Sequence, residues 1–358
     1  MKIKNFKKMK LSKLFTALFF NVIVCLSISA ATGLNPLALA AGGTVLSTLV
    51  KNVPGSLNMA IQKEIWMNSI IEGLFADNSF LSKAYNADMF VNSGRTVHIP
   101  NAGAPSNVVK NRTSKPASVS TRTDADLTFD LDEFTTDPIY IPQADTVELS
   151  YNKRESVLRQ DKAKLQEVVS EAFLYKWSPA SAGTIPTTGA NVAAHTDSAT
   201  GNRLKFVKAN VLSAMTQFNK DNIPATDRYL LLDAVMYSQL LEDLTANESQ
   251  AFHAGVDTKN GIVGKLFTFN VMVRSKALRY TSGGNPKEWT TGGAAGDNAG
   301  ALAWHINSVC RALGEVKAYE SEGDPTWYGD IYSFLVRAGG RLMRQDVKGV
   351  LAIVQAAA

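Results

Sequence analysis

The sequence predicts a mixed α+β fold, and three observations point to it. The first is a run from Lys153 to Trp177 that contains neither proline nor glycine and keeps one helical period throughout. The second is a pair of segments, residues 95–100 and 127–132, in which apolar and polar side chains alternate as in half-buried strands. The third is the order of the expected elements, which lacks the strand–helix alternation of a doubly wound protein.

Composition places the chain among globular proteins and leaves most of it nearly uncharged. Of its 358 residues, 45% are hydrophobic and 19% are charged, which is enough apolar material for a large core. Six of the 37 basic residues lie among the first 13 residues, so the rest of the chain carries 31 basic against 32 acidic side chains. Beyond its first residues, the chain therefore implies no basic face for nucleic acid.

Residues 1–41 have the pattern of a secretory signal. Lysines precede an uncharged apolar run at residues 14–31, and small-residue cleavage patterns follow it. Export is the favoured interpretation; a membrane-touching arm, a segment removed during maturation and a start codon placed too far upstream are the alternatives. Cys25 lies in the apolar run, so a disulfide with Cys310, the other cysteine, is not expected.

The run beginning at Lys153 is expected to form an amphipathic helix that acts as a strut. Its apolar residues fall on one stripe, and lysines and glutamates occupy the other faces. Pro179 ends it, because proline has no amide hydrogen and restricts the residue before it. At a rise of roughly 1.5 Å per residue, the helix would reach about 37 Å. The expected buried stripe is Leu158, Leu165, Val168, Val169, Ala172 and Phe173.

Upstream of this helix, the sequence predicts a first helix and then an extended β-hairpin. Residues 57–75 have helical apolar spacing. Residues 94–142 hold the two alternating strands, a polar tip between them at residues 101–120, and a further strand-like run at residues 137–142. About 20 structureless residues are unusual within a compact domain. We therefore expect the tip to reach outward to a partner.

Helices and strands are mixed in the rest of the chain. Asp233 is the expected N-cap of one helix, and Phe267, Phe269, Val271 and Val273 are expected on one face of a strand pair. In order, the expected elements are a loop at 179–203, helix 207–219, strand 227–232, helix 233–244, paired strands within 261–274, a glycine-rich loop at 281–300, a short helix 303–313, and strands 316–319, 328–337 and 346–354.

No group of residues points to catalysis or to a bound cofactor. An acidic cluster at residues 124–133 lacks the glycine and terminal glutamate of a calcium loop, and residues 261–265 lack the surroundings of a phosphate loop. Cys310 has no evident base partner. We expect no enzyme activity, no catalytic, cofactor-binding or metal-binding residues, no cofactor and no small-molecule substrate. Metal-ligand spacing is missing among the four histidines, His98, His195, His253 and His305.

Four short sequence segments stand out because of the order in which they occur along the chain. They are KEIW at residues 63–66, VHIP at 97–100, DNIP followed by DRYLLL within 221–232, and YGDIYS at 328–333. Together with a helix, a long hairpin, a strut helix, a mixed lobe and a closing strand, they resemble the major capsid proteins of tailed bacteriophages, which have the Hong Kong 97 fold. The resemblance covers about residues 55–358. It rests on the order of these segments and not on any one of them.

The resemblance implies a division of the chain into parts. These are a signal-like or cleavable leader at 1–41, an N-terminal arm and helix at 42–93, an extended β-hairpin loop at 94–143, a peripheral domain with a spine helix at 144–206 and 341–358, and an axial domain at 207–340.

The resemblance also implies a function and partners. Copies would assemble through hexamers and pentamers into an icosahedral head enclosing double-stranded DNA, with the hairpin of one subunit lying over its neighbour. The implied partners are other copies, portal and scaffolding proteins, and packaged DNA held by non-specific contacts. The implied location is the virion after assembly in the host cytoplasm, which the signal-like leader does not fit. An encapsulin-like compartment shell and an exported surface or binding protein are the two alternatives.

Overall fold

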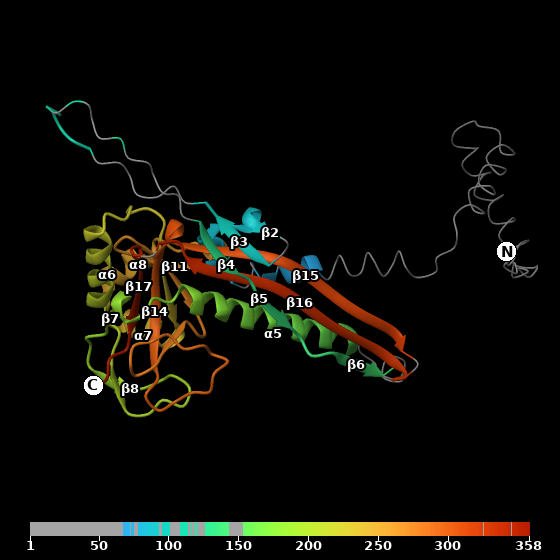
Figure 1. The fold of residues 1–358 in the computed structure, drawn as a ribbon. Coiled ribbons are helices and arrows are strands. Elements are labelled where there is room, and N and C mark those ends of the chain that lie inside the picture. Colours follow the sequence, from blue (N-terminus) through green and yellow to red (C-terminus); the bar gives the residue numbers. More distant parts are fainter. Residues whose placement is uncertain are drawn as a thin grey trace, which may run out of the picture. The chain divides into compact units, whose positions relative to one another are not determined.

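The computed structural model describes most of the chain after residue 66 (Figure 1). The chain divides into two units, Met1–Gln62 and Lys63–Ala358, and every described residue belongs to the second. The signal-like leader and most of the expected hairpin tip lie outside the described residues, as does the first half of the helix expected over residues 57–75. The described residues are 67–71, 73–74, 78–92, 95–100, 108–113, 115, 119, 126–142, 153–324, 326–344 and 346–358.

A mixed sheet of seven strands is the largest in the described part of the chain. Its order is β11–β12–β10–β14–β17–β7, with β13 also paired to β14. Strand β10 runs parallel to β12 and antiparallel to β14, and β17 runs parallel to β7. The strands are β7 (Thr184–Pro186), β10 (Arg228–Asp233), β11 (Ile262–Leu266), β12 (Phe269–Arg274), β13 (Leu278–Tyr280), β14 (Asn298–His305) and β17 (Val350–Val354).

Helices cover both faces of this sheet. In β10, Leu230 and Leu232 pack with α6, α7 and α8, whereas Tyr229 and Leu231 face the opposite way, into the cluster that contains α5. Asp233 caps α7 as predicted, because its carboxylate accepts the amide hydrogen of Met236 at 2.6 Å. The helices are α5 (Lys153–Trp177), α6 (Lys208–Lys220), α7 (Ala234–Asp243) and α8 (Ala246–His253).

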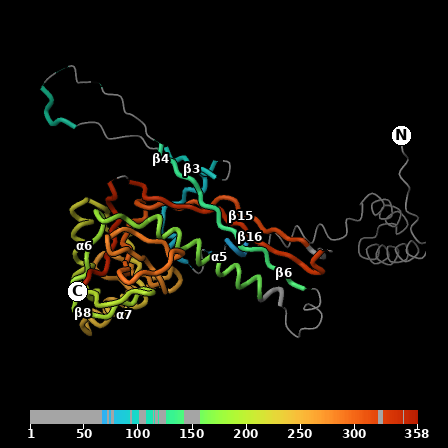
Figure 2. Tube along the Cα trace, turned by 60° about the horizontal axis from the view of Figure 1, so that its bottom comes forward, coloured from blue at the N-terminus to red at the C-terminus, as the bar shows by residue number. Residues whose placement is uncertain are grey.

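The second large sheet is built on a long two-stranded ribbon, β15 (Val309–Asp324) paired antiparallel with β16 (Gly329–Leu342). The other edge of β16 pairs with β5 (Asp132–Thr135) and β6 (Ile139–Pro142), and β1 (Tyr85–Asn86) joins the start of β15. Helix α5 runs beside this ribbon in both views (Figures 1 and 2).

The long helix begins and ends where the sequence predicts, but more of its circumference is buried than an amphipathic strut requires. Within the expected stripe, Leu158, Leu165, Val169 and Phe173 are at most 5% exposed. Glu171 was expected on a solvated face and is also buried, which raises the pKa of its carboxyl. On the same turn of the helix, Ser170 Oγ accepts a hydrogen bond at 2.6 Å from Arg274, at the end of β12.

The pairing of the two expected hairpin strands is confirmed: they are β3 (Thr96–Ile99) and β4 (Leu127–Asp130), and β2 (Val91–Asn92) adds a third strand beside β3. Strands β3 and β4 pair antiparallel in the expected alternation. Their inward side chains, Val97, Ile99 and Leu127, pack on Cys310 and Ala312 of β15. The base of the hairpin is therefore anchored on the ribbon.

The helix expected over residues 303–313 is wrong. These residues form the end of β14, one short turn and the start of β15. Strand β14 is buried on both faces, so it reads as a nearly continuous apolar run without the period-two alternation that marks a half-buried strand. Phe267 was also misplaced: it occupies a turn with φ of +52° and is 46% exposed.

Two long-range pairings connect segments that are distant in the chain. Strand β17 lies in the seven-stranded sheet beside β14, although the two fall in different expected domains. The ribbon, expected within the same domain as β14, lies along α5. The remaining elements are strands β8 (Asn191–Ala193) and β9 (Asn202–Leu204) and the 3₁₀ helices η1 (Ser79–Lys83), η2 (Asp88–Phe90), η3 (Ser181–Gly183), η4 (Thr258–Asn260) and η5 (Ile306–Ser308).

Residues 67–71 and 73–74 are helical, as the prediction for residues 57–75 requires. Ile70 and Leu74 in this helix are buried in the same cluster as α5. Of the helices in the described ranges, none has both the length and the apolar composition needed to span a membrane.

Candidate assembly surfaces

A cluster of aromatic side chains joins α5 and the ribbon to the seven-stranded sheet. Trp177, the last residue of α5, is fully buried, and its indole N–H donates to the carbonyl oxygen of Cys310 in β15 at 2.8 Å. Its ring centroid lies 6.2 Å from that of Trp304 in β14. Phe80, Phe173 and Tyr229 complete the cluster. Because packed rings with satisfied N–H groups have one orientation, this cluster fixes the ribbon to the sheet.

The described tip of the hairpin carries exposed valines and unpaired positive charge. Val108 and Val119 are 92% and 96% exposed. Lys110, Arg112 and Lys115 are exposed, and none of them has an ion-pair partner among the described residues. No acidic residue occurs from residue 89 to residue 123. The tip is therefore a basic segment with apolar side chains that nothing in the described part of its own chain covers.

The far end of the ribbon presents three aromatic side chains to solvent. Tyr140 in β6 is 41% exposed, and Trp327 and Tyr328 in the β15–β16 turn are 60% and 79% exposed. The Tyr140 hydroxyl donates to the carbonyl oxygen of Trp327 at 2.5 Å, and their ring centroids lie 6.0 Å apart. Tyr328 has a φ of +53°. Exposed aromatic side chains held in one arrangement are typical of protein–protein contacts.

A groove runs along α5, between this helix and strands β5 and β6. Two adjoining cavities of about 480 and 330 Å³ form it, and Phe134 and Val168 line both. Val168 and Ala172 of the expected core stripe are only partly buried because they face this groove. Its acidic residues are Asp132, Glu133, Asp137, Asp161, Glu171 and Glu288; its lysines are Lys164 and Lys176. We call this surface the α5 groove.

Charges in the α5 groove are only partly balanced. Asp132 pairs with Lys176 at 3.0 Å, and Glu133 pairs with Arg337 at 2.8 Å. Asp137 and Asp161 have no ion-pair partner among the described residues, and partial burial raises the pKa of the Asp161 carboxyl. The groove therefore keeps a negative balance over an apolar floor.

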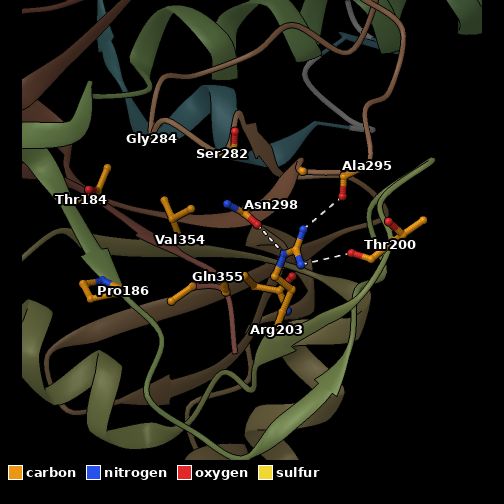
Figure 3. A pocket seen from close by; sticks show the side chains of 13 residues that line it. Thr184, Pro186, Thr200, Arg203, Ser282, Gly284, Ala295, Asn298, Val354 and Gln355 are labelled. Atoms are coloured by element: carbon orange, nitrogen blue, oxygen red, sulfur yellow. Dashed lines mark hydrogen bonds between the residues drawn. The ribbon is translucent and has the colours of Figure 1, made fainter.

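A third hollow, near the end of the chain, has a volume of about 580 Å³ (Figure 3). Arg203 from β9 is its charged side chain, and all five of its N–H groups are used. Nε donates to Asn298 Oδ1 at 2.5 Å, and the two terminal nitrogens donate to backbone carbonyl oxygens. Because no donor is left for a ligand, Arg203 acts as a clamp between β9, β14 and the loop before β14. Those carbonyl oxygens belong to Thr200, Asn202, Ala295 and Asp297.

The structure keeps the four histidines apart. His98 is exposed on β3 and His253 is exposed at the end of α8. His195 Nε2 lies 2.9 Å from Asp233 Oδ2, which fastens the loop before β9 to the start of α7. Burial lowers the pKa of His305 at the end of β14. Within the ranges that the structure describes, no group of three or more His, Cys, Asp or Glu side chains could hold a metal ion.

The other singled-out residues have structural roles. Gly261 sits in the turn before β11 with φ of +71°, and Gly264 packs directly on the ring of Phe252, so this segment is part of a strand pair. Asp130 accepts a hydrogen bond from Thr96 at 2.9 Å across the hairpin. Cys310 is buried, which raises the pKa of its thiol to about 11.

Sequence reasoning missed the α5 groove and the aromatic end of the ribbon. The groove combines side chains from β5, β6, α5 and the loop at Trp289, which only the tertiary fold brings together. The ribbon end had a local signal, the adjacent Trp327 and Tyr328 just before Gly329. The acid-free stretch of the hairpin was likewise visible in the sequence.

Comparison with known proteins gives matches in structure alone. No family model matches the sequence, and no curated protein matches it. The capsid of Ralstonia phage GP4 has a TM-score of 0.52 at 13% identity, covering 77% of this chain and 87% of that chain. The capsid of a native GTA particle has a TM-score of 0.51 at 11% identity, covering 78% and 90%. The capsid of cyanophage P-SCSP1u has a TM-score of 0.50 at 15% identity, covering 77% and 86%.

These alignments run through most of each capsid chain and about three quarters of this one. Identities this low establish the fold and nothing finer. The chain has the α+β Hong Kong 97 fold found in phage capsids.

Proposed function

We propose that this chain is the major capsid protein of a tailed bacteriophage. The observation that carries the proposal is the match of one continuous fold to 86–90% of the length of phage and GTA capsid chains. Copies would assemble through hexamers and pentamers into an icosahedral head that encloses double-stranded DNA. The described residues supply exposed surfaces for contact, which is consistent with a structural role.

Three features of the chain support self-assembly. The described tip residues of the hairpin are uncovered valines and cations. The ribbon ends in exposed aromatic side chains, and the α5 groove offers an apolar floor. Outside the first 13 residues, basic and acidic side chains nearly balance, so that copies do not repel one another strongly. A subunit that tiles needs such heterologous surfaces, which differ on the two sides of each contact.

We further propose that the chain divides by sheet membership. The peripheral domain would consist of α5, β5, β6 and the ribbon, and the axial domain of the seven-stranded sheet with α6, α7 and α8. Strand β17 would then return the chain to the axial domain. Residues 1–41 would be a leader that is removed during maturation. Portal and scaffolding proteins and DNA held without sequence preference would be the partners, and the virion the location.

Sedimentation and negative-stain electron microscopy of the expressed full chain test the proposal. We expect ring-shaped capsomers or closed shells that sediment far faster than a monomer of 38.7 kDa. A chain that stays monomeric at every concentration up to about 100 μM would contradict self-assembly. Many weak interfaces act together in a capsid, so that shells form at far lower protein concentrations.

A further inference from the structure

We propose that the hollow clamped by Arg203 binds a phosphate group, either inorganic phosphate or a small phosphate monoester. This hollow of about 580 Å³ is lined by parts of β7, β9, β14 and β17 and by the loop before β14 (Figure 3). The inference concerns a single subunit and goes beyond the proposed assembly. It rests on a buried charge without a counter-ion, on a hydrogen-bond donor of fixed orientation and on the size of the hollow.

The positive charge of Arg203 has no counter-ion. The residue is 7% exposed, and it forms no ion pair with a carboxylate of any described residue. Its hydrogen bonds go to neutral oxygens, the side-chain amide of Asn298 and four backbone carbonyls. A buried charge is costly unless an opposite charge lies close to it. An anion in the hollow would supply that opposite charge.

The buried charges beside the hollow add to this positive excess. Asp297 lies one residue before Asn298, and its carboxylate is 2.7 Å from Lys287 Nζ and 3.9 Å from Arg279 Nε. One carboxylate therefore serves two cations. Arg203 lies next to this group, because it donates to the backbone carbonyl oxygen of Asp297 at 3.3 Å. Three cations thus share one buried carboxylate, and a concave surface with an excess of one charge attracts ions of the opposite sign.

Arg203 also fixes the orientation of a hydrogen-bond donor. Asn298 Oδ1 accepts a hydrogen bond from Arg203 Nε, so Nδ2 is the other end of the amide. Figure 3 shows this nitrogen turned away from Arg203, toward the side of the hollow that carries Ser282 and Gly284. Neither Asn298 Nδ2 nor the exposed Ser282 hydroxyl has a hydrogen-bond partner among the described residues. Two donors are therefore available to an anion.

The charge, the donors and the volume together favour a phosphate group. A phosphate monoester carries close to two negative charges at neutral pH and has three strong acceptor oxygens, which suits two positive charges in excess and the donors of an amide and a hydroxyl. Arg203 would act through its charge alone, because its N–H groups are already used. The hollow exceeds the size of one phosphate, and Pro186 and Val354 line it beside the polar groups, so a small esterified group also has room.

Calorimetric titration of the full-length protein with sodium phosphate at low ionic strength tests the inference. We expect one site per chain with a dissociation constant below about 1 mM. Asn298→Asp keeps the shape of the side chain, removes the donor and places a carboxylate where Arg203 can pair with it, so phosphate should bind at least about tenfold more weakly. Ser282→Asp adds a negative charge at an exposed position of the hollow, leaves the Arg203 clamp intact and should weaken binding in the same way.

Asn247→Asp is the matched control. It changes the net charge as the two hollow variants do, at an exposed position of α8 outside the hollow, and should bind phosphate as the wild type does. Circular dichroism and thermal unfolding establish that the variants fold. Asn298→Asp should unfold at the wild-type temperature or slightly above it, because Arg203 gains a counter-ion. If Asn298→Asp does not fold, Ser282→Asp decides the test.

Competition identifies the source of the phosphate. Displacement of inorganic phosphate by adenosine monophosphate supports a site for monoesters, and failure to displace it supports a site for the free ion. Displacement by a short DNA duplex would overturn the inference in favour of a DNA-binding surface. No saturable binding up to about 20 mM phosphate, or equal binding by the wild type and both hollow variants, would also overturn it. Electron microscopy of the same samples scores assembly separately, so failure of this inference and failure of the proposed function are distinguishable.

Discussion

The indole rings of Trp177 and Trp304 lie 6.2 Å apart at an interplanar angle of 41° and connect the end of α5 with the centre of the seven-stranded sheet. Each indole N–H is satisfied by a backbone carbonyl oxygen from a third segment, Cys310 for Trp177 and Lys83 for Trp304. The pair therefore fixes the angle between ribbon and sheet, and in a tiling subunit that angle sets how neighbouring copies meet.

Replacing Trp177 by alanine should destabilise the subunit strongly. The change removes a fully buried ring and leaves the carbonyl of Cys310 without its donor, so we expect a loss of about 3–5 kcal/mol in the free energy of unfolding. Trp177→Phe should cost less, because it removes the hydrogen bond but keeps much of the packing. Urea unfolding measures both. The matched control is Trp327→Ala, at a residue that is 60% exposed, and it should change stability by less than about 0.5 kcal/mol; equal losses at the two positions would refute the role of the pair.

Leu165→Asp should prevent folding. Leu165 is 5% exposed in the cluster between α5 and the ribbon, and an unpaired carboxylate there costs several kcal/mol, about as much as a domain's whole stability. Ala163→Asp on the exposed side of the same helix is the control and should fold normally. Soluble yield and circular dichroism report the result. A folded Leu165→Asp subunit would mean that this side of α5 is not core.

Local patterns in the sequence predicted local structure well. The helical period and the flanking proline predicted both ends of α5, alternation predicted the β3–β4 hairpin, and the position of Asp233 predicted a helix cap. Each of these signals comes from neighbouring residues, because capping, period and proline chemistry act over one or two turns.

What the sequence could not predict depends on distant residues. Residues 303–313 were misassigned because a strand buried on both faces has no alternation to recognise. Glu171 is buried in the folded chain, where it lies in one cavity with Trp289, more than 100 positions further along the chain. The α5 groove, likewise, exists only because β5, β6 and the loop at Trp289 meet one side of α5.

The thiol of Cys310 should be protected and should make stability fall at high pH. Burial raises its pKa from near 9 to about 11. Between these pH values the unfolded chain loses the thiol proton while the folded chain keeps it, so stability decreases as pH rises, by up to about 1.4 kcal/mol per pH unit for this group. Below about pH 8 the group should have no effect.

Alkylation and unfolding in a Cys25→Ser background test the thiol directly. The folded subunit should resist alkylation at pH 8 and react after denaturation. The Cys310→Ala variant, which has no thiol at this position, should lose less stability between pH 9 and pH 11 than the protein that keeps Cys310. Rapid modification of the folded protein, or identical pH profiles for the two variants, would argue against burial of this group.

Deleting residues 101–120 should separate folding from assembly. The described tip residues are exposed and none belongs to a core cluster, so the shortened subunit should unfold at nearly the wild-type temperature. It should nevertheless fail to form stable shells if, as proposed, this segment makes contacts between copies. Size-exclusion chromatography with electron microscopy distinguishes the outcomes, and normal shells from this deletion would rule out the arm.

The most direct measurement is a cryo-electron microscopy reconstruction of particles formed by the full chain. The account predicts a closed shell with five-fold and six-fold clusters of this subunit, in which each hairpin crosses onto a neighbouring copy. A particle in which the hairpin lies against its own α5, or a preparation that contains only single subunits, would contradict it.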